Sequence, residues 1–181
     1  YHIKYEDDIY NYNQYRAQPT RYVREAYLFK TEDGSGEAWA VFDHDDFPNH
    51  REAFEYADSC GVNIAFSSRC FEEWLLLHFE RNTTAFTKSC CSIATNADSM
   101  QCGTGINSGD CHGNICIAGR LREQRYIADY SKDKKGLYDT YTAPRFPLCF
   151  INAAWSRSLS QDVVYNRNPY TNVANLICRL P

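Results

Sequence analysis

The feature that most constrains the fold is a short apolar run that ends in a group of acids. The segment Glu37–His50 reads EAWAVFDHDDFPNH, so the apolar run is followed at once by DHDD at residues 43–46. Apolar residues on both faces are typical of a strand buried in a parallel sheet. In open α/β sheets, ligands bind at the carboxyl ends of the strands. The sequence therefore predicts a buried strand over 37–43 with a functional site at its end.

The flanking residues predict an alternation of helices and strands. Helical patterns cover 19–30, 48–61 and 69–80, and strand patterns cover 37–43 and 62–68. The second helix has Asn49 as a candidate N-cap and Gly61 as a stop. This order favours a single α/β domain over 1–181, with a mainly parallel sheet flanked by helices.

The pattern changes after residue 80. Residues 81–119 are rich in Ser, Thr, Gly, Asn and Cys, and we interpret them as a Cys-rich loop insertion. Helical patterns return over 120–130, 137–141 and 146–159. The segment 168–180 predicts a terminal helix capped by Asn168 or Thr171.

Composition limits the cellular setting. The nine cysteines are an odd number, and the first residues are polar, so we expect a reducing, cytoplasmic location rather than secretion. No run approaches the ~20 apolar residues of a membrane-spanning helix. Four cysteines in apolar contexts are expected in the core: Cys60, Cys70, Cys149 and Cys178.

The acids after the first strand suggest a cation site. Asp43 and Asp45 are two residues apart, so in an extended chain their side chains point the same way, ~6–7 Å apart along the backbone. Such carboxylates repel each other unless a cation lies between them, and oxygen-only ligands suit Mg²⁺ or Mn²⁺. A solvated acidic loop is the simpler alternative. His44 would point to the opposite side of the strand and is a poor ligand.

A third carboxylate is expected from the next helix. Glu72 and Glu73 lie in its first turn, where acids also complement the helix dipole. That turn follows the second strand, so it lies at the same sheet edge as Asp43, and Glu72 is the closer of the two to this edge. His78 falls on the apolar face of the helix, which favours a core histidine over a catalytic one.

Two further groups of residues could bind ligands. Four metal-ligating side chains of the insertion could hold a structural Zn²⁺, although disulfides or free thiols are equally compatible: Cys102, Cys111, His112 and Cys116. The net charge of −4 provides no general attraction for nucleic acid. A local basic stretch could contact phosphates, or could be a solvated face: Arg120, Arg125, Lys132 and Lys134.

Longer motifs resemble a known family. The string CFEEWLLLHF at 70–79, the DHDD at 43–46, the segment YSKDKKGLYDTY and the ending NPYTNVANLICRL resemble the RloB-like proteins. These are bacterial phage-defence (abortive-infection) proteins with a predicted Toprim-like nuclease domain. The chain departs from the family pattern at Ser68 and Arg69, where Asn-Pro is usual.

The resemblance implies a fold and an activity. It implies a Toprim-like (Rossmann-like) domain that cleaves phosphodiester bonds of RNA, tRNA included, or of DNA, and an ATPase as a partner protein. It maps the metal ligands to Asp43, Asp45 and Asp46 and the catalytic residues to Glu72 and Lys132. Toprim nucleases also use a Glu in an E-G-x-x-T-E motif. We find no such motif, so we expect that the chain begins after the strand that carries it; the alternative is an inactive member of the family.

Two alternative functions stay open. A strand followed by D-x-D also resembles phosphatases of the haloacid dehalogenase type, in which Asp43 would be the nucleophile. Their usual Thr or Val after the second Asp is replaced by Phe47. The other alternative is a non-catalytic nucleic-acid-binding subunit of a defence complex, to which a partner supplies the missing acid.

Overall fold

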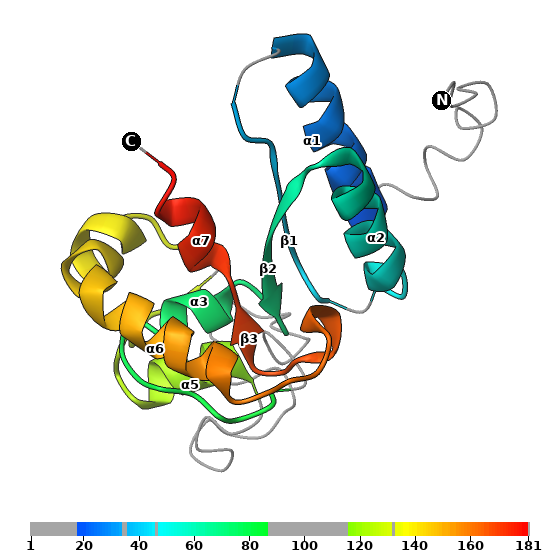
Figure 1. Cartoon of the computed structure of the whole chain (residues 1–181). Coiled ribbons are helices and arrows are strands. Elements are labelled where there is room, and N and C mark those ends of the chain that lie inside the picture. Colours follow the sequence, from blue (N-terminus) through cyan, green and yellow to red (C-terminus); the bar gives the residue numbers. More distant parts are fainter. Residues whose placement is uncertain (1–17, 34–35, 46, 87–115, 132, 181) are drawn as a thin grey trace. The chain divides into compact units, whose positions relative to one another are not determined.

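The computed structural model describes residues 18–33, 36–45, 47–86, 116–131 and 133–180 (Figure 1). The described residues form a mixed α/β structure with six α-helices and one open sheet of three strands. The chain divides into two compact units. Unit 1 comprises Tyr1–Phe42 and Asp46–Ile64, and unit 2 comprises Asp43–Asp45 and Ala65–Pro181. The single domain predicted for 1–181 stays a prediction. None of the described helices is long and apolar enough to cross a membrane.

Unit 1 is built around two helices that lie side by side, α1 (Pro19–Asp33) and α2 (His50–Cys60) (Figure 1). Val23 of α1 and Ala53 and Ala57 of α2 are buried. Gly61 ends α2 in the left-handed conformation with a φ of 67°, which a glycine adopts without steric cost. Lys30 Nζ donates a hydrogen bond of 2.7 Å to Gly61 O. The predicted stop at Gly61 is therefore confirmed.

The strands follow one another in space as β1 (Trp39–Asp43), β2 (Asn63–Ser68) and β3 (Tyr170–Thr171). Both strands predicted at 37–43 and 62–68 are present. Asn63 N donates to Ala38 O and His44 N donates to Ser67 O, so residue numbers rise in the same direction along β1 and β2. β3 pairs antiparallel with β2, with Ser67 opposite Thr171.

The expectation of a mainly parallel sheet is therefore wrong for its third strand. Residues 170–171 fell within the segment 168–180 predicted as a capped terminal helix, but the structure extends them as β3 and begins α7 (Val173–Ile177) later. The buried hydroxyls of Ser67 and Thr171 lie 2.8 Å apart and share a hydrogen bond. Asn172 occupies the N-cap position without a side-chain bond, whereas Thr171 Oγ1 accepts from Val173 N at 3.3 Å and so partly meets the prediction of a cap. Asn168 is not a cap, because its Nδ2 donates to Phe86 O.

Unit 2 carries the remaining helices. Their bounds are α3 Glu72–Leu76, α5 Ile117–Glu123, the π-helix η1 Tyr138–Thr142, the 3₁₀-helices η2 Ala143–Arg145 and η3 Val164–Asn166, and α6 Phe146–Ser158. The helix predicted over 69–80 is much shorter, because His78 N and Phe79 N bond to carbonyls three residues back and close the helix as turns. The helix predicted over 120–130 is α5, which begins earlier and ends at Glu123.

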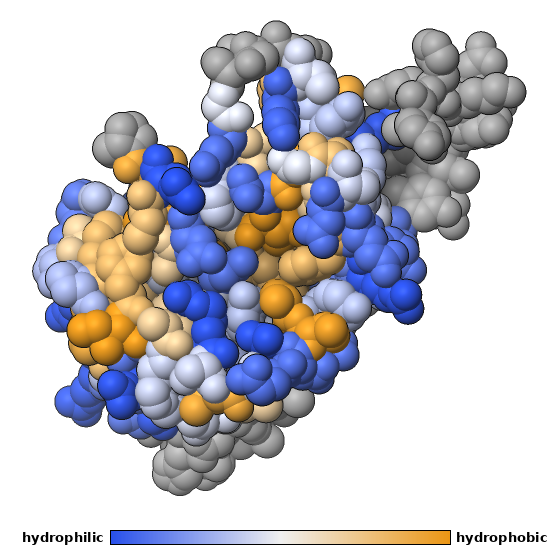
Figure 2. All heavy atoms as spheres, viewed as in Figure 1, coloured by the Kyte–Doolittle hydropathy of each residue, from blue (hydrophilic) through white to orange (hydrophobic). Residues whose placement is uncertain are grey.

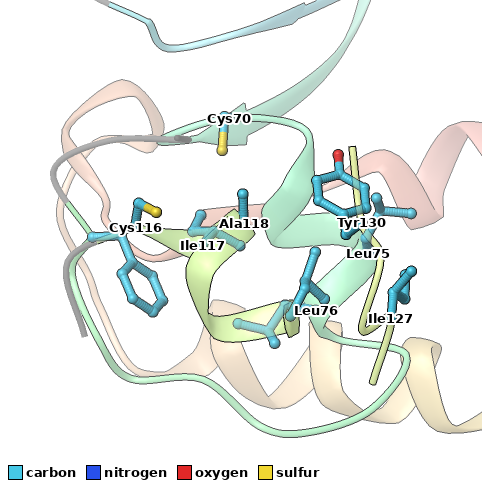
Figure 3. Close-up of a cluster of buried hydrophobic side chains, with 10 residues drawn as sticks. Cys70, Leu75, Leu76, Cys116, Ile117, Ala118, Ile127 and Tyr130 are labelled. Atoms are coloured by element: carbon cyan, nitrogen blue, oxygen red, sulfur yellow. The ribbon is translucent and has the colours of Figure 1, made fainter. Parts of the chain in front are cut away.

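A cluster of buried side chains supports α3 and α5 (Figure 3). This buried cluster consists of Cys70, Leu75, Leu76, Phe86, Cys116, Ile117, Ala118, Leu121, Ile127 and Tyr130. Phe86 and Cys116–Ala118 belong to the segment predicted as an insertion, so both described ends of that segment contribute to the core. Figure 3 shows the Tyr130 ring at the edge of the cluster, with its hydroxyl turned away from the apolar side chains.

The predicted core cysteines divide into two groups. Cys70 and Cys149 are fully buried, as predicted, whereas Cys60 is half-buried and Cys178 is exposed. Cys178 lies just beyond α7, where the apolar stripe predicted for a longer helix has already ended. All five described cysteines are free thiols.

Helix α6 is apolar on two faces. Its face toward the interior of unit 2 buries Cys149, Asn152 and Ala153. Leu148 and Ile151 remain 42% and 57% exposed. Figure 2 shows apolar atoms at the surface on the side of unit 2 where α6 lies. The apolar residues of this segment therefore do not fall on a single helical face in the sequence.

Leu76 tests the contribution of the buried cluster to stability. Leu76 is 0% exposed, so Leu76→Ala should lower the free energy of unfolding by about 2–5 kcal/mol through lost burial and a residual cavity. Leu148→Ala on the surface of α6 is the matched control and should change it by about 0.5 kcal/mol or less. Urea unfolding followed by tryptophan fluorescence measures both, and equal losses would contradict the assigned core.

Candidate acid site at the end of β1

The acid site consists of Asp43, Asp45 and Glu72, all in unit 2. Asp43 is the last residue of β1 and is half-buried, whereas Asp45 is exposed in the turn that follows. Asp45 has a φ of 37°, a left-handed conformation that aspartate tolerates better than most residues. His44 N bonds to Ser67 O at 2.9 Å and Asp45 N to Arg69 O at 3.2 Å. The turn is thus fixed against the end of β2.

The carboxyl group of Asp43 lies in an unfavourable place for negative charge. Burial, the charge of Asp45, a hydrogen bond with the Asp45 side chain and the charge of Glu72 together raise the pKa of Asp43 to about 6. A hydrogen bond from the Phe71 backbone amide acts in the opposite direction and lowers this pKa. The three predicted acids therefore interact electrostatically at one edge of the sheet, as the strand order implied.

Glu72 is buried and is hydrogen-bonded to Tyr130, a member of the buried cluster. It is 4% exposed, and Tyr130 Oη donates a hydrogen bond of 3.0 Å to Glu72 Oε1. Burial, the charge of Glu72 and a hydrogen bond with its carboxylate raise the pKa of the Cys70 thiol far above its usual range. Cys70 is therefore a protonated thiol near pH 7, which excludes a thiolate nucleophile at this site.

The arrangement offers oxygen ligands in a limited number. Among the described residues, no group of three or more His, Cys, Asp and Glu side chains is placed to hold a metal ion. Asp46, the third predicted ligand, lies outside these residues. Mg²⁺ commonly takes only one or two protein carboxylates and completes its coordination with water and substrate phosphate. The paired oxygens of Asp43 and Asp45 therefore fit such an ion in chemical type.

The predicted phosphate-binding residues are largely engaged with acids. Arg120 forms a bidentate ion pair with Glu80, with N–O distances of 2.8 and 3.0 Å. Lys134 pairs with Asp129 at 2.6 Å, whereas Arg125 is exposed. A phosphate would have to compete with these carboxylates for Arg120 and Lys134. Lys132 lies outside the described residues.

The predicted zinc ligands are mostly outside the described residues, as Cys102, Cys111 and His112 all are. Cys116 is described and fully buried. Its Sγ accepts a hydrogen bond of 3.2 Å from Gly119 N at the start of α5. Cys116 thus has a structural role as a cap within the buried cluster.

Two ionisable side chains in or just after α3 are fully buried. Glu73 is fully buried, accepts a hydrogen bond of 2.9 Å from Asn82 Nδ2, and has no partner for Oε1 within the described residues. His78 is also fully buried and packs edge-on against Trp74, and burial lowers its pKa. The expected core histidine is confirmed. The burial of Glu73 was missed because its position in a first helical turn suggested exposure.

Three further residues of the site were missed by the sequence analysis. Tyr130 was noted only as a possible stacking residue, Cys70 only as a core residue, and Arg69 only as a departure from a pattern. Arg69 and Cys70 follow the end of β2, which indicates that they lie near the acids but not which contacts they make. Tyr130 lies seven residues beyond α5, and no local pattern indicated its contact with Glu72.

Comparison with known proteins confirms the family that the motifs indicated. A family model described as RloB-like protein matches residues 2–180. Because this match spans nearly all of the 181 residues, the chain belongs to the RloB-like family. No curated protein and no solved structure matches the chain.

Glu73 should make stability depend on pH. Burial raises the pKa of Glu73 to about 8 from its ordinary 4.5, so the folded chain keeps a proton that the unfolded chain releases. The free energy of unfolding should therefore fall as the pH rises from about 4.5 to 8. Glu73→Gln should remove the part of this dependence that Glu73 contributes, so its stability relative to the wild type should increase with pH and reach a few kcal/mol at pH 8, about 1.4 per pKa unit.

Urea unfolding at a series of pH values measures this effect. Exposed Glu52→Gln is the matched control and should leave the pH dependence unchanged. A difference in stability between Glu73→Gln and the wild type that stays constant from pH 5 to pH 8 would contradict the assignment of Glu73 as a buried neutral carboxyl.

Proposed function

We propose that this chain is a divalent-cation-dependent nuclease that cleaves phosphodiester bonds in RNA (tRNA included) or in DNA. The observation that supports the proposal most directly is the crowding of negative charge around Asp43, whose pKa is raised to about 6. Crowded carboxylates, one of them half-buried, are stabilised by a cation or by a proton. At neutral pH a cation is the stronger partner, because the proton has largely left.

Asp43 and Asp45 would hold Mg²⁺ or Mn²⁺. Such an ion, when bound, would supply Lewis-acid stabilisation of the phosphate oxygens and a more acidic bound water. The chain itself keeps the ligands in place. The Phe71 amide orients the Asp43 carboxylate, and backbone hydrogen bonds from His44 and Asp45 fix the turn. Asp46 is the additional ligand implied by the family motif.

Glu72 is the proposed proton-transfer residue. Tyr130 donates to one of its oxygens, which fixes the rotation of the carboxylate within a buried setting. A fixed carboxylate beside two charged acids is suited to accept or release a proton during hydrolysis. Lys132 is proposed as a second catalytic residue because the family motif maps to it.

The wider biological role is part of the same proposal. Membership of the RloB-like family supports a role in phage defence, with an ATPase as partner and a cytoplasmic location. A Toprim-like arrangement is supported by the β1–α2–β2 order, in which acids follow the first strand. The proposed zinc site in the Cys-rich segment rests only on its Cys and His residues.

The first test is cation binding by the full chain. Calorimetric titration with Mn²⁺ should detect binding by the wild type at pH 7.5, and none by the Asp43→Asn, Asp45→Asn double variant. The double variant should fold with at least wild-type stability, because two repelling charges are removed. Its circular dichroism and urea unfolding are therefore the necessary controls.

Activity separates the candidate reactions. Labelled single-stranded RNA, single-stranded DNA and an aryl phosphate are incubated with the wild type and the double variant, with Mg²⁺ or with chelator. Cleavage of an oligonucleotide that needs both the acids and the cation supports the nuclease. Release of phosphate from the aryl ester alone would favour the phosphatase with Asp43 as nucleophile. Nucleic-acid binding without any cleavage would favour the binding subunit.

A further inference from the structure

Arg69 contacts the acid turn through both its backbone and its side chain. The N–H of Asp45 donates to Arg69 O at 3.2 Å, and Arg69 Nη1 donates to Asp45 O at 3.1 Å. A single residue thus bonds both backbone polar groups of Asp45. Arg69 Nη1 also lies 2.9 Å from His44 Nδ1. These contacts join the end of β2 to the turn that follows β1.

The donors and acceptors present decide the direction of these bonds. A guanidinium carries only donors and a carbonyl oxygen only accepts, so Asp45 O accepts from Arg69 Nη1. His44 Nδ1 lies 2.9 Å from Arg69 Nη1 and 2.6 Å from Asp45 O, and the tautomer of the ring decides whether it accepts from Arg69 or donates to Asp45 O. The His44 ring also packs against Phe66 of β2, with the ring centroids 6.3 Å apart. The His44 side chain therefore supports the turn.

These bonds stabilise a backbone conformation that carries strain. Asp45 has a φ of 37°, in the left-handed region that non-glycine residues adopt only at a cost in free energy. In that conformation the Asp45 side chain hydrogen-bonds with Asp43. Without the Arg69 contacts the turn could relax toward ordinary backbone angles, which would carry the Asp45 carboxylate away from Asp43.

We propose that Arg69 is a positioning residue of the acid site. Its guanidinium and its carbonyl hold the His44–Asp45 turn so that the Asp45 carboxylate faces Asp43 and both can bind one divalent cation. This inference rests on the proposed function, and it names the residue on which cation binding depends besides the acids themselves.

A positioning role and a simple charge effect predict opposite results. Arg69 is a cation whose side chain bonds to the Asp45 backbone, so as a point charge it weakens the attraction of the site for a metal ion. Removing it would then tighten cation binding. If Arg69 instead positions Asp45, removing it disorders one of the two ligands and weakens binding. The sign of the change therefore distinguishes the two roles.

The test is Mn²⁺ titration calorimetry on the full chain with Arg69→Met. The dissociation constant should rise about 10–100-fold, the range seen when residues that orient metal ligands are removed. Amide hydrogen exchange at Asp45, measured by NMR without metal, should also become faster. Arg69→Lys keeps the charge but not the planar fork, so it too should weaken binding, and it serves if Arg69→Met does not fold.

Arg145→Met is the matched control for loss of one arginine in the same unit. Arg145 donates to Tyr141 O at 2.8 Å and lies over the Phe79 ring, and it makes none of the contacts at the acid turn. Its Mn²⁺ affinity should equal that of the wild type. Asp45→Asn removes one of the two proposed ligands, and its Mn²⁺ affinity gives the reference value for that loss.

The outcomes separate this inference from the proposed function. Unchanged or tighter Mn²⁺ binding by Arg69→Met, with binding lost in Asp45→Asn, would overturn the positioning role and leave the proposed function standing. A wild type that binds no Mn²⁺ would overturn both. Weaker binding together with faster exchange at Asp45 supports the inference.

Discussion

The structure of unit 2 depends on how it holds several negative charges at one edge of the sheet. Asp43, Asp45 and Glu72 come from two segments that meet only because β1 and β2 are neighbours. Mutual repulsion would separate these side chains unless donors surround them. Donors are present at each acid: the Phe71 amide at Asp43, Tyr130 at Glu72, and Arg69 at the Asp45 backbone. The fold itself therefore brings these three acids close together.

Helix α3 fixes the position of Glu72 in this arrangement. The residues from Glu72 to His78 are all buried, so the segment is fixed on every side, unlike a surface helix with one exposed face. The Glu72 carboxylate bonds to Tyr130 of the buried cluster, whereas the carboxyl group of the neighbouring Glu73 points into the interior. Two adjacent acids thereby have different environments, one beside the other acids and one as a neutral interior group.

Local sequence patterns were sufficient for the parts of the fold that local chemistry decides. The strand before DHDD, the helix before Gly61 and the strand at 62–68 are present, because short apolar runs and a glycine stop act over a few residues. The convergence of Asp43 and Glu72 followed from the strand order. The short α3 and the extended β3 could not be predicted from local patterns, because tertiary burial and the pairing of Ser67 with Thr171 override helical spacing. Arg69 could not be assigned at all, since its contacts depend on a turn that only the folded chain forms.

The measurement that tests the central claim most directly is the titration of Asp43 itself. Carboxyl-carbon NMR shifts of the full chain, followed from pH 3 to pH 8 without divalent cations, report its protonation. The account predicts a midpoint near pH 6, because burial and the neighbouring acids raise the pKa to about 6. A midpoint near 3.8, the ordinary value for aspartate, would show that the acids do not crowd and would contradict the account.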